Sequence, residues 1–443
     1  TKRALRRSAK AGWWAVTPWR TSARLRFLRE REQQALAASS ARPLDGETSA
    51  QPHKTSPQVA TPPRRGASSQ PPLRIFEVAG GSPRISMVTD SINAGSLFGG
   101  VATALIFTAL LAKQTGRSLR IITRTQPPEA DNVATVFRAH GIAWTDNIDF
   151  VFADLHNKTN QIDVHADELF VTTSWWTTQA TRQTIADTQI LYILQEDERM
   201  FYPFGDDYLA CSEVISDRAI AKVINSELLH RHLVQDGVID AATPFFEPSF
   251  PKRIYYPAPD TRAQKRNFFF YARPYNARNL YERGIEVIEA ALERGILDPD
   301  EWNIHFVGKD LAPTLLSGGV EPILLQNLAW EDYADFVRSV DLALTLMYTP
   351  HPSYPPLDVA ACGGVAVTNR FGVKTDLSHY SRSILCADSE LEALVEGLKQ
   401  GVQKATDPKA RDEALASSQI LRDWPTSFAP VFEKIVEGRN LVH

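Results

Sequence analysis

The residues from Asp341 to Arg370 combine the side chains best suited to binding a polar ligand. They read DLALTLMYTPHPSYPPLDVAACGGVAVTNR, which predicts a buried strand, a polar loop, a short helix and a second buried strand. Pro355 and Pro356 favour the first turn of that helix, because their missing N–H groups are not needed there. Asp358 is then expected in the same turn, where the helix dipole favours negative charge. A carboxylate at a helix N-terminus suits hydroxyl groups better than phosphates, so this pattern indicates recognition of a sugar or ribose.

Cationic side chains follow two strands predicted in the second half of the chain. The strand NFFFYAR ends at Arg273, and the strand NIHFVGK ends at Lys309. An arginine at such a position pairs with a diphosphate through two hydrogen bonds, and a lysine adds positive charge as a diphosphate leaves. Arg278, which opens the next helix, is interpreted as a solvated residue, and a surface position is the alternative for Lys309.

A glycine doublet precedes the first long helix. Gly99 and Gly100 end the loop TDSINAGSLFGG, and an apolar helix is predicted from Val101. Glycines let a ligand approach the free N–H groups of a helix N-terminus, which favour anions. The loop matches neither GxGxxG nor GxxxxGK[ST], so neither a dinucleotide nor an ATP site is indicated. A tight strand-to-helix turn is the alternative.

Carboxylates and aromatic side chains are mixed in the segment ILQEDERMFYPFGDDY. Aromatic rings suit the C–H faces of sugars, and carboxylates suit their hydroxyl groups. We therefore assign Glu196, Glu198 and Tyr202 to an acceptor-side site, with Glu198 as the candidate to take a proton from an acceptor hydroxyl. Trp175 and Trp176, which follow another predicted strand, are assigned to the same site. An acidic loop with packed aromatics, and a core role for the tryptophans, are the alternatives.

Patterns for metal binding or covalent catalysis are missing from the sequence. The one D-x-D match, Asp298 to Asp300, falls in a predicted turn, and the histidines lack metal-ligand spacing. No nucleophile elbow or Ser-His-Asp order is present. We expect neither a metal ion nor a cofactor.

The composition predicts two folded domains in a chain of 443 residues with 43% apolar side chains. The net charge is −4, but residues 1–34 carry ten Lys or Arg against two Glu, which leaves −12 for the rest. An acidic remainder argues against a nucleic-acid-binding enzyme. Three well-separated cysteines suit a reducing cytoplasm, and no apolar segment reaches the ~20 residues that span a bilayer.

The beginning of the chain differs from the rest. Residues 1–34 combine basic side chains with three tryptophans, which predicts a helix lying on an anionic membrane face or, equally, a helical segment packed on the next domain. Residues 35–83 are rich in Ala, Ser, Pro, Gln and Thr and are expected to form a flexible linker. No secretory signal is visible, and the missing initiator Met suggests a processed chain or part of a longer polypeptide.

Strands and helices alternate twice, which predicts two doubly wound α/β domains facing each other across a cleft. The first covers residues 84–250, where YLACS and a helical stretch at 214–236 continue the pattern. A Pro-rich break follows, and the second domain covers residues 267–425. Residues 426–443 are expected to form a helix that packs back on the first domain.

Together, HPSYPPLDVAACGGVAVTN, FYARPYNARNL, WEDYADF, FYPFGDDY and SWWT resemble the WsaF-like rhamnosyltransferases of bacterial surface-glycan assembly. The resemblance runs from about residue 84 to the end of the chain. It implies a GT-B fold and transfer of L-rhamnose from dTDP-β-L-rhamnose to a growing polysaccharide, with retention of configuration and no metal ion. It also implies a nucleotide-sugar and a glycan as partners, a cytoplasmic location at the membrane face, and a place in a larger multi-domain protein.

The resemblance assigns roles to several of the candidate residues. Arg273 would hold the diphosphate, Tyr354 and Asp358 would contact the nucleoside, and Gly99 with Gly100 would edge the donor pocket. Two positions depart from the family pattern. Asp358 stands where Glu is usual, and Asn327 stands where the family often has a lysine. Lys309, at a neighbouring strand end, is our candidate to supply the missing charge, which makes Glu198, Arg273 and Lys309 the expected catalytic set.

Two other functions fit the same residues. One is a nucleotide-sugar epimerase on the same scaffold, which would convert the donor without any acceptor. The other is a non-catalytic sugar-binding module, in which the changes at Asn327 and Asp358 have removed turnover. Analysis of the products formed from donor alone separates the first from a transferase, and binding without turnover identifies the second.

Overall fold

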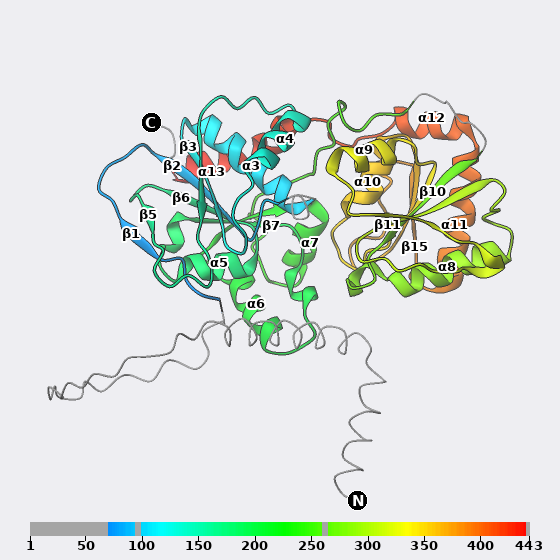
Figure 1. Cartoon of the computed structure of the whole chain (residues 1–443), viewed down its shortest axis with the longest axis horizontal. Helices are drawn as coiled ribbons and strands as arrows, with labels where there is room; N and C mark the ends of the chain where they lie inside the picture. The colour runs from blue at the N-terminus through cyan, green and yellow to red at the C-terminus, as the bar shows by residue number, and fades with distance from the viewer. Residues whose placement is uncertain (1–69, 94–98, 259–264, 440–443) are drawn as a thin grey trace, which may run out of the picture. The chain divides into compact units, whose positions relative to one another are not determined.

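The computed structural model describes residues 70–93, 99–258 and 265–439 (Figure 1). The chain divides into two units, residues 1–66 and 67–443, and every described residue belongs to the second. The predicted basic helix at 1–34 and most of the predicted linker lie outside the described residues.

The first half of this unit is built on a parallel sheet of seven strands, with the order β4-β3-β2-β6-β7-β8-β9. Its strands are β2 (Arg84–Thr89), β3 (Ser118–Thr123), β4 (Ile148–Phe152), β6 (Leu169–Thr172), β7 (Ile190–Leu194), β8 (Ala221–Asn225) and β9 (Phe245–Phe246). Its helices are α3 (Gly100–Thr115), α4 (Ala130–His140), α5 (Trp175–Arg182), α6 (Asp206–Ser216) and α7 (Glu227–Gln235), with 3₁₀ turns η1 (Asp187–Gln189) and η2 (Glu198–Phe201). We call this half the N-lobe.

The second half, the C-lobe, carries a parallel sheet of six strands in the order β12-β11-β10-β13-β14-β15. The strands are β10 (Arg266–Ala272), β11 (Trp302–Gly308), β12 (Ile323–Gln326), β13 (Leu342–Leu344), β14 (Val365–Asn369) and β15 (Ile384–Ala387). The helices are α8 (Tyr281–Glu293), α9 (Trp330–Arg338), α10 (Tyr354–Ala361), α11 (Leu391–Thr406) and α12 (Pro408–Ala416), with 3₁₀ turns η3 (Ala277–Asn279) and η4 (Ser317–Gly319).

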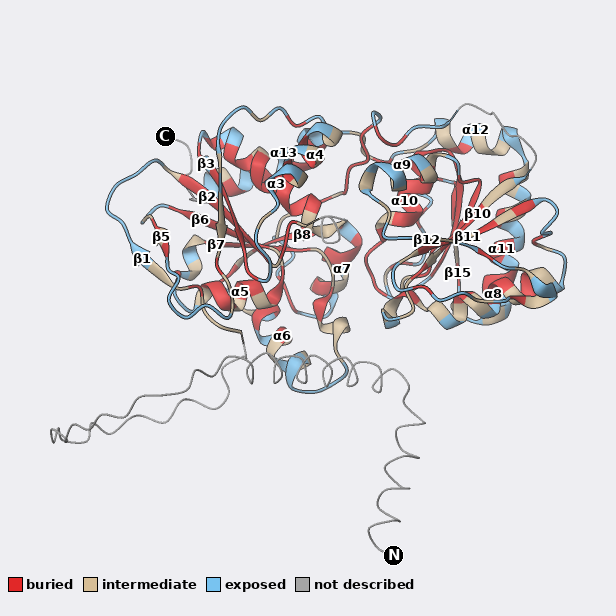
Figure 2. Cartoon of the chain, viewed as in Figure 1, coloured by how far each residue is buried: buried red, intermediate tan, exposed pale blue. Residues whose placement is uncertain are grey.

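Both sheets are covered on both faces, as the near-continuous apolar strands predict (Figure 2). In β10, Phe268 and Phe270 pack with α8 and α11, while Phe269 between them packs with α9 and α10 on the other face. The N-lobe repeats the arrangement, because Met87 and Val88 of β2 belong to opposite cores. Side chains alternate across a strand, so a run of apolar residues fills two cores at once.

Each sheet changes winding direction beside its first strand. In the N-lobe, β2 lies between β3 and β6, and in the C-lobe, β10 lies between β11 and β13. Ligands of open α/β sheets bind outside the carboxyl ends of the strands at such a switch point. The glycine doublet follows β2, Arg273 follows β10, and the loop 345–353 follows β13, so the topology directs three predicted segments to these edges.

The final helix, α13 (Trp424–Arg439), packs on α3 and β9 of the N-lobe. Its buried aromatic side chains Phe428 and Phe432 each contact the ring of Phe107 edge-to-face, with centroids 5.0 Å apart. The chain therefore crosses back from the C-lobe to the N-lobe after α12. No helix within the described ranges has the length and apolar character to cross a bilayer.

Three predictions about local structure are wrong. Residues 70–83 are not part of a flexible linker, since Leu73 is fully buried and β1 (Ile75–Glu77) pairs in parallel with β5 (Ile162–Val164). YLACS forms the middle of helix α6 rather than continuing the strands. The predicted helix at 214–236 is interrupted by β8. YLACS and residues 221–225 are short segments whose apolar pattern fits a strand and a helix equally well, so tertiary pairing decides between the two.

We predict that Gly308→Ala lowers stability by about 2–4 kcal/mol, since the added atom would clash with backbone. A Cβ at this position would lie 1.8 Å from the carbonyl oxygen of Ala272, its partner across the β10–β11 pairing. The thermal midpoint from circular dichroism tests this. The control is Gly438→Ala in α13, where a Cβ meets nothing within 4 Å. Equal midpoints for the two variants would contradict the prediction.

Candidate functional site

A cavity of about 700 Å³ is lined by residues of both lobes, at the carboxyl ends of their strands. It brings together all the residues predicted to bind the donor, together with one acceptor-side candidate: Gly99, Gly100, Glu196, Arg273, Lys309, Asn327, Tyr354 and Asp358. These residues come from six separate segments of the chain. The size and mixed lining fit a small polar ligand.

The glycine doublet forms the N-lobe wall of the cavity by letting other side chains approach. Gly99 has a φ of 62°, and a Cβ there would lie 3.3 Å from the ring of Tyr354. A Cβ on Gly100 would lie 3.2 Å from the amide nitrogen of Gln195, which donates a hydrogen bond to the Gly100 carbonyl at 2.7 Å. The N-terminus of α3, with its free N–H groups, therefore lines the cavity beside Tyr354 and Gln195, and the two glycines add no side chains of their own.

The C-lobe contributes cations that are not neutralised. Arg273 donates to the hydroxyl of Tyr271 at 3.1 Å, and Lys309 is exposed. Among the residues that the structure describes, no carboxylate forms an ion pair with either of them. Asn327 lies beside them with a φ of 52°, and its N–H donates to the carbonyl of Gly308 at 3.3 Å. Unpaired cations at strand ends leave their hydrogen bonds available to an anionic ligand.

Tyr354 connects the two lobes across the cavity. Its hydroxyl accepts a hydrogen bond from the Asn225 side-chain amide at 2.8 Å and lies 2.8 Å from the hydroxyl of Thr103. Burial raises the pKa of Tyr354 to about 12, so the phenol stays protonated. The side chain predicted to contact the nucleoside thus presents its ring to the cavity, while the N-lobe holds its hydroxyl.

Asp358 lines the cavity but does not occupy the first turn of its helix, so that prediction is wrong. Helix α10 begins one residue earlier than predicted, at Tyr354 after Ser353, and Asp358 is its fifth residue. The carboxylate is 4% exposed and accepts a hydrogen bond from the Tyr333 hydroxyl at 3.0 Å. Burial raises the pKa of Asp358 to about 7, against the hydrogen bonds from Tyr333 and Tyr255.

Glu196 reaches the cavity from the N-lobe and faces C-lobe cations. Its Oε2 atom lies 3.3 Å from Nη1 of Arg278, although the two are not aligned for a hydrogen bond. Burial raises the pKa of Glu196, while the charges of Arg278 and Lys374 oppose that shift. Arg278 is therefore not the solvated helix residue that was predicted, because its guanidinium also packs 4.2 Å from the centre of the Phe201 ring.

The loop after β13 is held in place by buried polar side chains. The ammonium group of Lys374, which is completely buried, donates to the Met347 carbonyl at 2.7 Å. The side-chain oxygen of Asn369 accepts from the Met347 N–H at 2.7 Å. Burial lowers the pKa of Lys374 to about 8. These contacts fix the segment that carries His351 and Tyr354 into the cavity.

Four predicted acceptor-side residues, Trp175, Trp176, Glu198 and Tyr202, do not line this cavity. Glu198 is 4% exposed and accepts a hydrogen bond from the Trp175 N–H at 2.7 Å, so it caps the N-terminus of α5. The indole of Trp175 donates to the Tyr202 hydroxyl, and that of Trp176 donates to the carboxylate of Asp90. These side chains are used within the N-lobe, so Glu198 does not stand where it could receive a proton from a ligand in the cavity.

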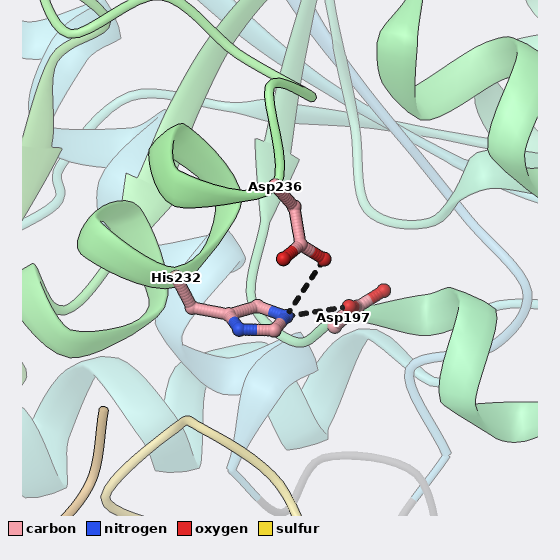
Figure 3. Close-up of side chains that lie close together, drawn as sticks. All are labelled: Asp197, His232 and Asp236. Carbon is pink, nitrogen blue, oxygen red and sulfur yellow. Dashed lines mark hydrogen bonds and ion pairs between the residues drawn. The ribbon is translucent and has the colours of Figure 1, made fainter. Parts of the chain in front are cut away.

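Asp197, His232 and Asp236 have side chains close enough to hold a metal ion (Figure 3). The Nε2 atom of His232 lies 3.0 Å from Asp197 and 3.6 Å from Asp236. Arg199 also pairs with both carboxylates, at 2.6 and 2.9 Å. Burial would raise the pKa of Asp197, but hydrogen bonds from His232 and Arg199 outweigh it and lower the pKa. A guanidinium already supplies the charge that a metal would bring, so the cluster clamps the loop beside Glu196.

Sequence reasoning missed several residues of the cavity. Tyr255, Tyr333, Asn225, Thr103 and His351 all line it. They come from a linker, two helices, a strand end and a loop; Tyr333 lies in WEDYADF and His351 in HPSYPPLDVAACGGVAVTN, but neither was assigned a role in the site. Position after a predicted strand was a signal for His351, whereas Asn225 fell inside the helix predicted at 214–236, which the structure replaces with β8.

Comparisons with known protein families match both lobes. The model of the WsaF N-terminal domain matches residues 84–227, and that of the WsaF C-terminal domain matches residues 266–399. Among curated proteins, the O-antigen biosynthesis protein RfbC of Myxococcus xanthus is 27% identical over 249 residues. The match covers 56% of this chain and 19% of RfbC, so it spans about a fifth of that relative's length.

Solved structures with similar folds include glycosyltransferases of low sequence identity. Anabaena HepE in complex with UDP-glucose has a TM-score of 0.56 and 14% identity, covering 80% of this chain and 99% of HepE. WaaG, a glycosyltransferase of lipopolysaccharide biosynthesis, has a TM-score of 0.55 and 12% identity, covering 79% and 99%. These likenesses confirm the predicted fold class, GT-B, with two Rossmann-like sheets.

We predict that Glu198→Gln changes the pH dependence of stability. Burial raises the pKa of Glu198 from its ordinary value of 4.5 to about 8. Between these two pH values the carboxyl group is protonated in the folded protein and ionised in the unfolded chain. The contribution of this group to stability therefore falls as pH rises from about 4.5 to 8, by up to about 1.4 kcal/mol per pH unit.

Glutamine accepts the same Trp175 N–H bond without titrating. The thermal midpoint of the variant, relative to wild type, should therefore rise between pH 5 and pH 8. A difference that stays constant over this range would show that Glu198 is ionised in the folded protein.

Proposed function

We propose that this chain, which belongs to the WsaF family, is a glycosyltransferase that transfers L-rhamnose from dTDP-β-L-rhamnose to a growing surface polysaccharide. The family and the GT-B fold support a glycosyltransferase of surface-polysaccharide synthesis. The rhamnosyl donor and retention of configuration rest on the motif resemblance. The observation that carries the proposal is the convergence of Arg273, Lys309 and two helix N-termini on one cavity.

The arrangement suits a nucleotide diphosphate as the leaving group. Arg273 and Lys309 bring two positive charges that no described carboxylate neutralises, and the start of α3 adds free N–H groups. Charge that develops on the diphosphate as the glycosidic bond breaks would be stabilised by these groups. The glycines at positions 99 and 100 keep that helix terminus accessible.

The other side of the cavity suits the nucleoside. Asp358 has a carboxylate within hydrogen-bonding reach of two tyrosine hydroxyls, and it would accept hydrogen bonds from ribose or base. The ring of Tyr354 presents an apolar face beside it. Asp358 is one methylene shorter than the glutamate usual in the family, and Tyr333 and Tyr255 fill the space around its shorter side chain.

A group other than Glu198 must accept the proton of the acceptor hydroxyl, because Glu198 is buried away from the cavity. We propose that the departing diphosphate takes it, as a retaining reaction on a single face allows.

A second consequence concerns metal ions. Arg273 and Lys309 supply the positive charge at the diphosphate, which supports a metal-independent reaction.

The proposal extends to location and partners. We expect the enzyme to act in the cytoplasm, with residues 1–34 at the inner membrane face, and as part of a larger glycan-synthesis protein. The three cysteines Cys211, Cys362 and Cys386 are free thiols, in keeping with a reducing compartment.

We predict that Arg273→Ala weakens binding of dTDP-β-L-rhamnose by about 10- to 100-fold, the value of a charge-assisted contact to a diphosphate. Isothermal titration of the full chain measures this directly. The control is Arg283→Ala, which removes an arginine that pairs with Glu286 on α8 outside the cavity. Unchanged affinity in the Arg273 variant would contradict the site.

The reaction itself is tested by incubating the wild type with dTDP-, UDP- and GDP-sugars and a rhamnose-bearing acceptor, followed by mass analysis. A mass gain of one deoxyhexose on the acceptor, from the dTDP donor alone, is the expected result. Conversion of the donor without acceptor would indicate the epimerase. Binding without any new product, across a panel of acceptors, would indicate a sugar-binding module.

A further inference from the structure

A group of polar atoms at the interlobe end of the cavity is left without hydrogen-bond partners. His351 is 5% exposed and lines the cavity, yet its Nε2 atom has no partner in the part of the chain that the structure describes. The Oε2 atom of Glu196 is likewise inaccessible and accepts no hydrogen bond from any described residue. Leaving buried polar groups unpaired is costly, so native proteins rarely tolerate two of them together without a ligand or water.

The protonation of His351 follows from its neighbours. The Ser353 N–H donates to Nδ1 at 2.9 Å, so Nδ1 is the acceptor and Nε2 carries the proton of the neutral ring. Burial lowers the pKa of His351 to about 3, which keeps the ring neutral at physiological pH. His351 therefore offers one N–H donor and no charge.

Glu196 provides the complementary acceptor. Its Oε1 atom lies 3.8 Å from Nδ1 of His351, and its Oε2 atom faces Arg278 at 3.3 Å without hydrogen-bond alignment. The carboxylate comes from the loop after β7, which the Arg199 clamp on Asp197 holds in place. The Glu196 carboxylate and the His351 ring, which carries the Nε2–H donor, therefore lie close together, one from each lobe.

Glu196 and His351 together determine which chemical groups of a ligand can bind beside them. A phosphate cannot donate to the Glu196 carboxylate and would be repelled by its charge. An alcohol both donates and accepts, so one hydroxyl could give its proton to Glu196 and accept the Nε2–H of His351. The cations suited to the diphosphate, Arg273 and Lys309, follow other strands of the C-lobe.

We propose that Glu196 and His351 form a hydroxyl-recognition subsite for a pyranose ring, and that together they determine which sugar is accepted. The inference rests on the proposed transferase function, since it assigns the sugar part of the substrate to this end of the cavity. A site built to hydrogen-bond a hydroxyl discriminates strongly against analogues without it, because its own buried groups are then left unpaired.

The test compares two ligands that differ only in the sugar. The full chain is titrated with dTDP and with dTDP-β-L-rhamnose, for the wild type and Glu196→Gln. We expect Glu196→Gln to leave dTDP affinity within about twofold of wild type and to weaken dTDP-rhamnose binding by about 10- to 100-fold. Loss of both affinities by the same factor would mean that Glu196 only holds Arg278 and the lobes, and would overturn the proposal.

A pair of histidine variants tests the donor side independently. His351→Asn keeps an acceptor for the Ser353 N–H but removes the Nε2–H group, whereas His351→Gln places an amide N–H near the Nε2 position. The proposal expects the asparagine variant to lose affinity for the sugar nucleotide and the glutamine variant to retain more of it. Equal affinities in the two variants would contradict a role for the Nε2–H.

The hydroxyl could belong to the acceptor sugar instead of the donor sugar. In that case donor titrations stay unchanged, and the KM for the rhamnose-bearing acceptor rises about 10- to 100-fold in Glu196→Gln. No change in either the donor affinity ratio or the acceptor KM would overturn the subsite. Glu198→Gln is the matched control, since it neutralises a buried carboxylate two residues along the same loop but outside the cavity.

A different result would contradict the proposed transferase function. If the wild type binds none of the dTDP-, UDP- or GDP-sugars, the transferase assignment is wrong. Suppose instead that the wild type binds one of these sugar nucleotides. If Glu196→Gln then leaves unchanged both the ratio of affinities for that sugar nucleotide and its nucleoside diphosphate and the KM for the acceptor, only the subsite proposal is wrong.

Discussion

Parallel strand pairing in both lobes is the constraint on which the rest of the structure depends. Because all strands of a sheet point the same way, every loop after a strand emerges at one edge. Two such edges share one cavity, so residues as distant in sequence as Gly99 and Asp358 line the same space. The chain needs no contiguous motif to assemble a site, only short polar segments after buried strands.

The two lobes contribute different chemistry to the cavity. The C-lobe supplies cations at strand ends, and the N-lobe supplies a carboxylate and a helix terminus free of side chains. Some contacts between the lobes involve residues that also line the cavity. Tyr354 bonds to Asn225, and Arg278 faces Glu196, so a ligand that fills the cavity would touch the groups that hold the lobes together. Such coupling lets substrate binding and lobe closure reinforce each other.

Burial sets the protonation of the carboxyl groups in and around the site. The pKa values of Glu196, Glu198 and Asp358 are all raised by burial, but their surroundings give them different uses. Glu198 has a backbone partner and holds a helix. Asp358 has tyrosine partners and keeps a face on the cavity. Glu196 has a nearby cation without hydrogen-bond alignment, which leaves its Oε2 atom with capacity for a ligand.

The sequence by itself determined the architecture and much of the donor side. Two rounds of alternating apolar strands and amphipathic helices are local patterns, and they predicted two parallel sheets with Arg273, Lys309, Tyr354 and Asp358 at their edges. The acceptor side could not be read in this way. Trp175, Glu198 and Tyr202 follow strands just as the donor residues do, yet their side chains turn into the N-lobe.

Tertiary packing alone decided which side of a loop each residue faces. Glu196 and Asp197 are consecutive residues of one loop, yet Glu196 lines the cavity and Asp197 pairs with His232. The same packing brought in Asn225 and Thr103, paired them with Tyr354 and isolated the Nε2 atom of His351. Spacing along a chain specifies helix faces and strand ends, whereas the partner of a loop side chain depends on elements far away in sequence, and that information appears only when both lobes are folded together.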